Sequence, residues 1–143
     1  MTARIRRAAY AVASPTVLTL RHFRAIGYRA SVVERNVRYG NDRVLKQDHY
    51  GFDVEALKPG EPPTLIQCTT AGNAKARMAK LTRVPTPAAK GGNAPAGLEN
   101  TLWLLRCGWR LYVQGWTKQG RCREWAARLV SGKVEWHETG GGQ

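Results

Sequence analysis

The stretch from Gly51 to Arg77 constrains the fold most, because it reads as strand, turn, strand and helix in immediate succession. Its two apolar segments are GFDVEAL and TLIQCTT, separated by a turn rich in Pro and Gly at residues 58–63. The segment AGNAKAR that comes next reads as the beginning of a helix. We therefore expect two neighbouring strands that pair as a hairpin, followed directly by a helix.

Asp53 is the polar residue of the first of these strands. Side chains along a strand alternate between its faces, so Asp53 is expected opposite the apolar residues Phe52, Val54 and Ala56. A carboxylate in an otherwise apolar strand favours a functional role. The alternative is that Asp53 is a simple exposed strand residue, as Glu55 is on the same face.

The second strand carries two polar side chains, Gln67 and Thr69, which the alternation places on the face of Leu65. If the hairpin forms, Asp53 and Gln67 lie side by side at one sheet edge. An acid beside a second oxygen donor, with a third polar group two residues on, is how many nucleases hold Mg²⁺ against a phosphate. The alternatives are a glutamine on a half-exposed strand and a threonine favoured by strand propensity.

Charge is the strongest compositional feature of the chain. Its 143 residues include 23 Lys and Arg against 10 Asp and Glu, a formal net charge of +13. Such an excess attracts polyanions and releases their counterions, so nucleic acid is the first partner to consider. The alternative is a basic protein without such a partner. A membrane partner is not expected, because no basic amphipathic helix with a large apolar face is visible.

The length fits a single domain, which we place at residues 14–138. A basic arm precedes it at residues 1–13, and a disordered tail follows at 139–143. The short, interrupted apolar run of the arm does not favour a secretory signal. The three cysteines, which show no metal-ligand spacing, indicate reduced thiols and a cytoplasmic protein, bacterial or in the host cytoplasm if the chain is of phage origin: Cys68, Cys107 and Cys122.

The remaining elements are placed by helix caps and turn residues. Ser14-Pro15 opens a helix that Gly27 ends, and the alternating residues 28–35 read as the first strand. Residues 36–50 either extend the hairpin or form a loop near the substrate. A loop rich in Pro and Gly is expected at 82–97, after the helix that begins in AGNAKAR. Beyond it we expect a helix with an inward stripe and then further strands, with the stripe formed by Leu98, Leu102 and Leu105.

This order of elements, with an acid in the second strand and a polar-x-polar pair in the third, resembles the PD-(D/E)XK nuclease superfamily. The superfamily includes restriction endonucleases and archaeal-type Holliday junction resolvases. The likeness covers roughly residues 14–116. It implies an α/β fold with a restriction-endonuclease-like αβββαβ core, in which a mixed sheet is flanked by helices.

The resemblance also implies a site. GFD, ending at Asp53, stands for the family's Asp, and LIQCT, with Gln67 and Thr69, stands for its Glu-x-Lys. Glu34 corresponds to an additional acid found in many members. Mg²⁺ or Mn²⁺ would be held by Asp53, Gln67 and the carbonyl of Cys68.

The resemblance further implies a phosphate contact from the helix after the second motif strand, and two departures bear on the chemistry. Gln in place of Glu removes one negative charge, and Thr in place of Lys removes a positive one. The candidates that could supply this charge or contact DNA are Lys46, Asn73, Lys75, Arg77 and Lys80. Other candidates for the site or for base stacking are Asp48, His49 and Trp116.

Three functions are consistent with these expectations. The first is a metal-dependent nuclease that hydrolyses DNA phosphodiesters, including those of branched or structured DNA, as a monomer or a homodimer. The second is a nucleic-acid-binding protein that keeps the fold without catalysis. The third, from a different class, is a small structural or assembly protein whose basic surface coats RNA or DNA.

Overall fold

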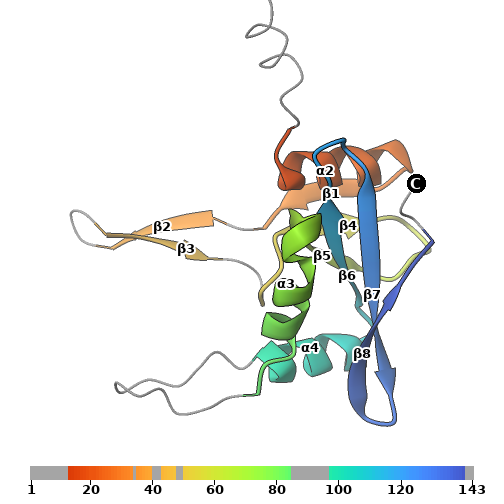
Figure 1. The fold of residues 1–143 in the computed structure, drawn as a ribbon. Helices are drawn as coiled ribbons and strands as arrows, with labels where there is room; N and C mark the ends of the chain where they lie inside the picture. Colours follow the sequence, from red (N-terminus) through yellow and green to blue (C-terminus); the bar gives the residue numbers. More distant parts are fainter. Residues whose placement is uncertain (1–12, 34, 40–42, 48–49, 85–96, 141–143) are drawn as a thin grey trace, which may run out of the picture.

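The protein is an α/β structure in which helices flank a mixed sheet (Figure 1). The computed structural model describes residues 13–33, 35–39, 43–47, 50–84 and 97–140. Within these ranges it has a six-stranded sheet, three α-helices and a separate two-stranded hairpin. The predicted class, a mixed sheet between helices, is confirmed.

The first described helix, α2 (Pro15–Ala25), begins and ends where the sequence predicts. The hydroxyl of Ser14 accepts a hydrogen bond of 3.3 Å from the Val17 amide, which caps the first turn. Gly27 takes a left-handed conformation with φ of 95° immediately after the helix. This conformation is accessible to glycine without steric cost, so it turns the chain toward the sheet.

Six strands form the main sheet in the order β1-β4-β5-β6-β7-β8. Neighbouring strands are antiparallel except β5 and β6, which are parallel. The predicted hairpin is the β4–β5 pair, with Val54 opposite Ile66. The strand bounds are β1 (Arg29–Val32), β4 (Val54–Leu57), β5 (Thr64–Thr70), β6 (Arg110–Trp116), β7 (Cys122–Val130) and β8 (Lys133–Glu138).

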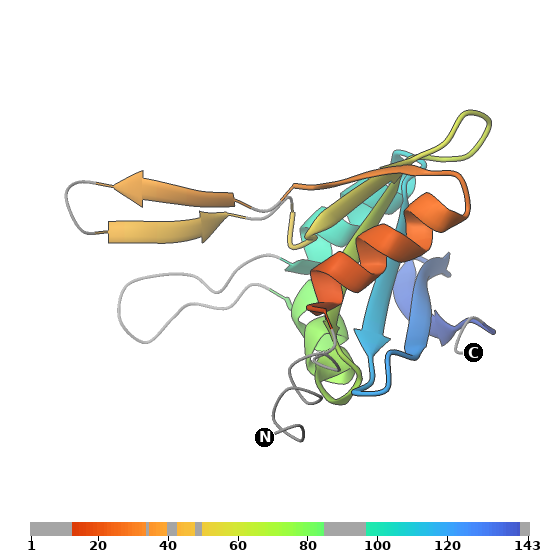
Figure 2. The ribbon, with the colours of Figure 1, turned by 90° about the horizontal axis from the view of Figure 1, so that it is seen from above.

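The parallel pair requires a crossover, and the two remaining helices lie in it. After β5 the chain forms a 3₁₀ turn, η1 (Ala71–Asn73), and continues directly into α3 (Ala74–Leu81). The helix α4 (Gly97–Arg106) then leads into β6. Both helices cover the face of the sheet opposite α2, as Figure 2 shows from above.

A second, two-stranded sheet is inserted between β1 and β4. It consists of β2 (Arg35–Tyr39) and β3 (Arg43–Gln47), paired antiparallel. In both views this hairpin extends away from the main sheet (Figures 1 and 2). The sequence left open whether this region extends the hairpin or forms a loop, and the structure instead shows a separate hairpin.

Two hydrophobic clusters fill the two sides of the sheet. Below α2 lie Phe23, Ala30, Val54, Ala56, Ile66 and Cys68. Below α3 and α4 lie Phe52, Leu65, Ala74, Met78, Leu81, Leu104, Leu111, Val113 and Trp125. Every residue of β5 except Thr70 is buried, because helices cover both of its faces.

The predicted alternation of the first motif strand is wrong at one position. Phe52 packs below α3 and α4, whereas Val54 and Ala56 pack below α2. The strand β4 begins only at Val54, so Asp53 lies in an irregular step between Phe52 and the strand. An extra residue of this kind shifts the faces, as a β-bulge does.

The inward stripe of α4 also differs from the prediction. Thr101 and Leu104 are its buried residues, whereas the predicted stripe of Leu98, Leu102 and Leu105 is half-buried. The Thr101 hydroxyl donates a hydrogen bond of 2.6 Å to the carbonyl of Leu81. A polar residue therefore takes the innermost position because it satisfies the last turn of α3.

The described chain ends in a segment tied to β7. The Thr139 amide donates to the carbonyl of Glu124 at 2.8 Å, and its hydroxyl donates to the Glu124 carboxylate at 2.9 Å. The sequence predicted a disordered tail from residue 139, so the ordered chain reaches past β8. Residues 141–143 and the first 12 residues of the predicted arm lie outside the described ranges.

Candidate functional site

The candidate site is built where the two motif strands meet, and Asp53 is its first component. The Asp53 side chain is buried, with 6% of its surface exposed. Its Oδ2 accepts a hydrogen bond of 3.0 Å from the backbone amide of Cys68. The two halves of the predicted motif are therefore in direct contact.

The backbone of β5 adds a second oxygen at this edge. The Asp53 amide donates to the carbonyl of Ile66 at 3.0 Å, so Ile66 presents its backbone toward Asp53. Backbone groups two residues apart on a strand point the same way. The backbone of Cys68 therefore points to the same side of β5 as that of Ile66, the side on which Asp53 lies.

Gln67 has a different set of partners from those predicted. Its side chain is 2% exposed and bridges two elements. Its Nε2 donates to the carbonyl of Gly51, and its Oε1 accepts a hydrogen bond of 3.1 Å from Arg77 Nη1. The amide oxygen that was expected to face a metal ion is thus bound by a guanidinium from α3.

Thr69, two residues after Gln67 on β5, is also bonded by a side chain from the segment that follows the strand. Its hydroxyl accepts a hydrogen bond of 3.3 Å from Asn73 Nδ2. Two residues of a strand span about 6.6 Å and four residues of a helix about 6 Å. The distance between Gln67 and Thr69 therefore matches the distance between Arg77 and Asn73. The short turn η1 sets this register.

The helix α3 supplies the positive charge of the site. It carries three basic residues and no acidic one. Arg77 is half-buried against Gln67, whereas Lys75 and Lys80 are exposed. Arg77 is thus the basic residue of α3 that contacts a motif residue of β5, whereas the two lysines are exposed on the helix.

The donor chemistry at this edge fits a hard divalent cation in part. A carboxylate and a backbone carbonyl are oxygen ligands of the kind that Mg²⁺ uses, together with waters and substrate phosphate. The side-chain oxygen of Gln67 is a neutral third oxygen atom, and it already accepts a hydrogen bond from the Arg77 guanidinium. In the described part of the chain, no group of three or more His, Cys, Asp or Glu residues is placed to hold a metal ion.

Several candidates fall outside this site. Glu34, Asp48 and His49 lie outside the described residues. Lys46 is in β3, opposite Asn36 in the projecting hairpin, and its side chain also lies outside the described part of the structure. Asn73 ends η1 and is the N-cap residue of α3, as the sequence predicts for a helix that starts there, but its side chain bonds Thr69 and caps no helical amide.

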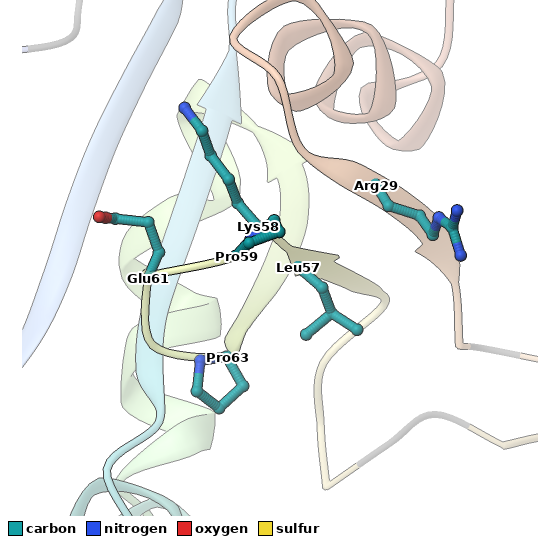
Figure 3. A pocket seen from close by; sticks show the side chains of 6 residues that line it. All are labelled: Arg29, Leu57, Lys58, Pro59, Glu61 and Pro63. Atoms are coloured by element: carbon teal, nitrogen blue, oxygen red, sulfur yellow. The ribbon is translucent and has the colours of Figure 1, made fainter.

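A hollow of about 530 Å³ lies beside Leu57, the last residue of β4 (Figure 3). Asp53 directly precedes the other end of this strand. It is formed by the ends of two strands and the turn after β4. The Lys58 ammonium is engaged elsewhere, since it donates to the carbonyl of Ile26 at 3.0 Å and lies 5.3 Å from the Tyr28 ring centre. The hollow is lined by Arg29, Leu57, Lys58, Pro59, Glu61 and Pro63.

The sequence reasoning missed a second pocket, of about 370 Å³, next to the candidate site. It lies between the turn before Gly51 and one face of α4. The signal that could have revealed it is the large aromatic residue Trp103, which is 65% exposed on a helix. Its lining consists of Tyr50, Asn100, Trp103, Leu104, Cys107 and Trp109.

Comparison of the chain with protein-family models, curated proteins and solved structures finds no match in any of the three. No helix within the described ranges has the length and apolar character needed to span a bilayer. All three cysteines are free thiols. A function must therefore be inferred from the geometry of the site.

Proposed function

We propose that the chain is a metal-dependent nuclease that hydrolyses DNA phosphodiesters on a restriction-endonuclease-like αβββαβ core. The order of elements supports this, since α2, β1, β4 and β5 are followed by α3 and by β6, which runs parallel to β5. The hairpin of β2 and β3 is then an insertion into that core. The net charge of +13 supports a polyanionic substrate.

The observation that carries the proposal is the contact between Asp53 and the Gln67-Cys68-Thr69 segment. A buried carboxylate accepts the amide of the central residue of that segment at 3.0 Å. This contact supports a shared role for the Asp53 carboxylate and the Cys68 backbone. A buried, hydrogen-bonded carboxyl group is typical of cation-binding and catalytic sites.

Each residue has a defined role in this proposal. Asp53 and the carbonyl of Cys68 hold Mg²⁺ or Mn²⁺, with Gln67 beside them. When bound, the ion supplies a water of lowered pKa and offsets charge on the phosphate. Arg77 keeps its contact with Gln67 and directs its other N–H groups to a phosphate oxygen, and Lys75 adds positive charge outside.

The test is nicking of plasmid and junction DNA with Mg²⁺ or Mn²⁺, comparing the wild type with Asp53→Asn. This variant keeps the size of the side chain and an oxygen for the Cys68 amide, but removes the charge. Nicking should fall by about a hundredfold or more, while DNA binding is retained. The matched control is Glu55→Gln in the same hairpin, which should nick normally. Equal nicking by both variants would refute the proposal.

A second candidate is a nucleic-acid-binding protein on the same core that has lost catalysis. Two observations favour it. The Arg77 guanidinium already donates to the Gln67 oxygen, and Thr69 stands where the motif has lysine. In this case the wild type binds DNA but does not nick it, whichever metal ion is added. The double variant Gln67→Glu, Thr69→Lys restores the motif and should then gain nicking, which separates the two candidates.

A further inference from the structure

The aromatic pocket beside the site is the feature that goes beyond the proposed hydrolysis. We propose that it binds one unpaired nucleobase of the DNA strand whose phosphate lies at Asp53 and Arg77. The inference rests on the proposed function for its nucleic-acid partner and for the place of the phosphate. It narrows the substrate to single-stranded, branched or locally opened DNA.

The lining has the chemistry that recognises a base. Three of its six residues are aromatic, and Trp103 exposes 65% of its surface at the rim. Bases stack on aromatic side chains with little dependence on sequence, because every base has a π-face. The amide of Asn100 offers both a donor and an acceptor, which suits the polar edge of a base.

The helix α4 presents this lining as one continuous surface. Asn100 and Trp103 lie three residues apart on one side of the helix, and Cys107 directly follows its last residue. Leu104 forms the apolar part of the lining and belongs to the core cluster. The base-binding surface is therefore carried by a packed element that is formed before any ligand binds.

The turn on the other side joins the pocket to the candidate site. Tyr50 lines the pocket in a left-handed conformation with φ of 57°, and Gly51 follows with φ of 92°. Such conformations in a residue other than glycine are costly and concentrate at functional positions. The carbonyl of Gly51 accepts the Gln67 amide, so a single residue separates the pocket from the Gln67–Arg77 contact.

Charge favours a base of nucleic acid over an apolar segment of a protein. The described lining contains no Asp or Glu. On the same face of the sheet, α3 carries Lys75, Arg77 and Lys80. Aromatic side chains combined with nearby cations are the arrangement that binds a single strand, with bases on the rings and phosphates on the cations. A paired base cannot enter, because its faces are covered by its neighbours.

The test is fluorescence anisotropy in EDTA, which excludes cleavage, with labelled oligothymidylate and a duplex of equal length. Trp103→Ala should weaken single-strand binding by about tenfold or more, the effect of losing one stacked base. Duplex binding and the salt dependence should stay the same, because phosphate contacts are untouched. Trp103→Phe should restore most of the affinity, and Leu129→Ala, an exposed apolar residue on β7, should match the wild type.

The proposal is overturned if Trp103→Ala binds the single strand as the wild type does, or loses single-strand and duplex binding equally. It is also overturned if the wild type self-associates through Trp103, as shown by a smaller species for Trp103→Ala in size-exclusion chromatography. Thermal melting checks that the variant is folded. Loss of nicking in Asp53→Asn leaves this result unaffected, so each proposal can fail alone.

Discussion

Two buried glutamines on adjacent strands serve different purposes. Gln67 lies on β5 and Gln114 on β6, and they are 2% and 0% exposed. In the parallel register Gln114 pairs with Cys68, the neighbour of Gln67. Gln67 contacts α3, whereas Gln114 contacts α2. They therefore lie on opposite faces of the same part of the sheet.

Gln114 belongs to a network that ties elements together. Its Oε1 accepts from the Thr19 hydroxyl at 2.9 Å, and its Nε2 donates to the Glu124 carboxylate at 2.7 Å. The Thr19 hydroxyl also accepts from the Trp116 indole at 3.0 Å. The network joins α2, β6 and β7, and such satisfied buried networks make packing unique.

Gln67 has one structural partner and one cationic partner. The Gly51 carbonyl fixes the turn beside the aromatic pocket, and Arg77 is only half-buried. Burial of a polar residue therefore does not by itself mark a functional site. What distinguishes Gln67 is the charged, partly accessible group to which it is bonded.

The largest effect on stability is expected for Gln114→Leu. The substitution leaves the Thr19 hydroxyl and the Glu124 carboxylate without their shared partner, which costs about 2 to 4 kcal/mol of unfolding free energy. Urea denaturation measures it, with Thr19→Ser as a control that keeps the hydroxyl. If Gln114→Leu is as stable as the wild type, the network does not brace the sheet.

Arg77→Ala should act on binding more than on stability. The loss of a charge-assisted phosphate contact should weaken affinity for DNA by about tenfold. Lys80→Ala removes an equal charge from an exposed position on the same helix, and should have a smaller effect. The two variants are compared in filter binding at equal salt. Equal losses would show that α3 acts through charge alone.

Gln67→Leu should cost less stability than Gln114→Leu, about 1 kcal/mol, because Arg77 can turn to water. The same variant should lower DNA binding or nicking, since Arg77 is no longer held. Measuring both in one preparation sharpens the comparison between the two glutamines. A stability loss equal to that of Gln114→Leu would remove the distinction.

The smallest effect is expected for the dependence of stability on pH that Cys122 causes. Burial, with the nearby Glu124 carboxylate, raises the pKa of Cys122 from 9.0 to about 12. The folded thiol keeps its proton longer than the unfolded thiol. Its contribution to stability is therefore complete below pH 9.0 and is lost as pH rises toward about 12.

Urea midpoints below and above pH 9.0 test this point. Cys122→Ala should lose less stability than the wild type over this rise in pH, and Cys107→Ala should behave as the wild type. In a native thiol titration the exposed Cys107 should react well before the buried Cys122. Rapid reaction of Cys122 would show that the α2 side is open.

Local signals in the sequence were sufficient for much of the fold. The cap at Ser14, the stop at Gly27 and the turn at 58–63 predicted α2 and the β4–β5 hairpin. The face of Phe52 was not predictable, because one irregular residue inverts the alternation. The stripe of α4 was missed because a threonine takes the innermost place through a hydrogen bond to α3.

The site was predicted in its components but not in its contacts. The proximity of Asp53 to the second motif strand follows from the hairpin register. The contact of Arg77 rather than Lys75 with Gln67 depends on how α3 is rotated on the sheet. The pocket around Trp103 joins residues about 50 apart in sequence, which periodicity alone does not connect. The roles of these residues remain predictions.

The three residues of η1 have a consequence for how this chain can evolve. Because each added or deleted helical residue rotates the remainder of the helix by about 100°, a change of length there would swing Arg77 away from Gln67 and Asn73 away from Thr69. Descendants of this protein should therefore accept insertions in the turn at 58–63, while the spacing from Gln67 to Arg77 stays constant at ten positions. This constant spacing can identify distant relatives even after most side chains have changed.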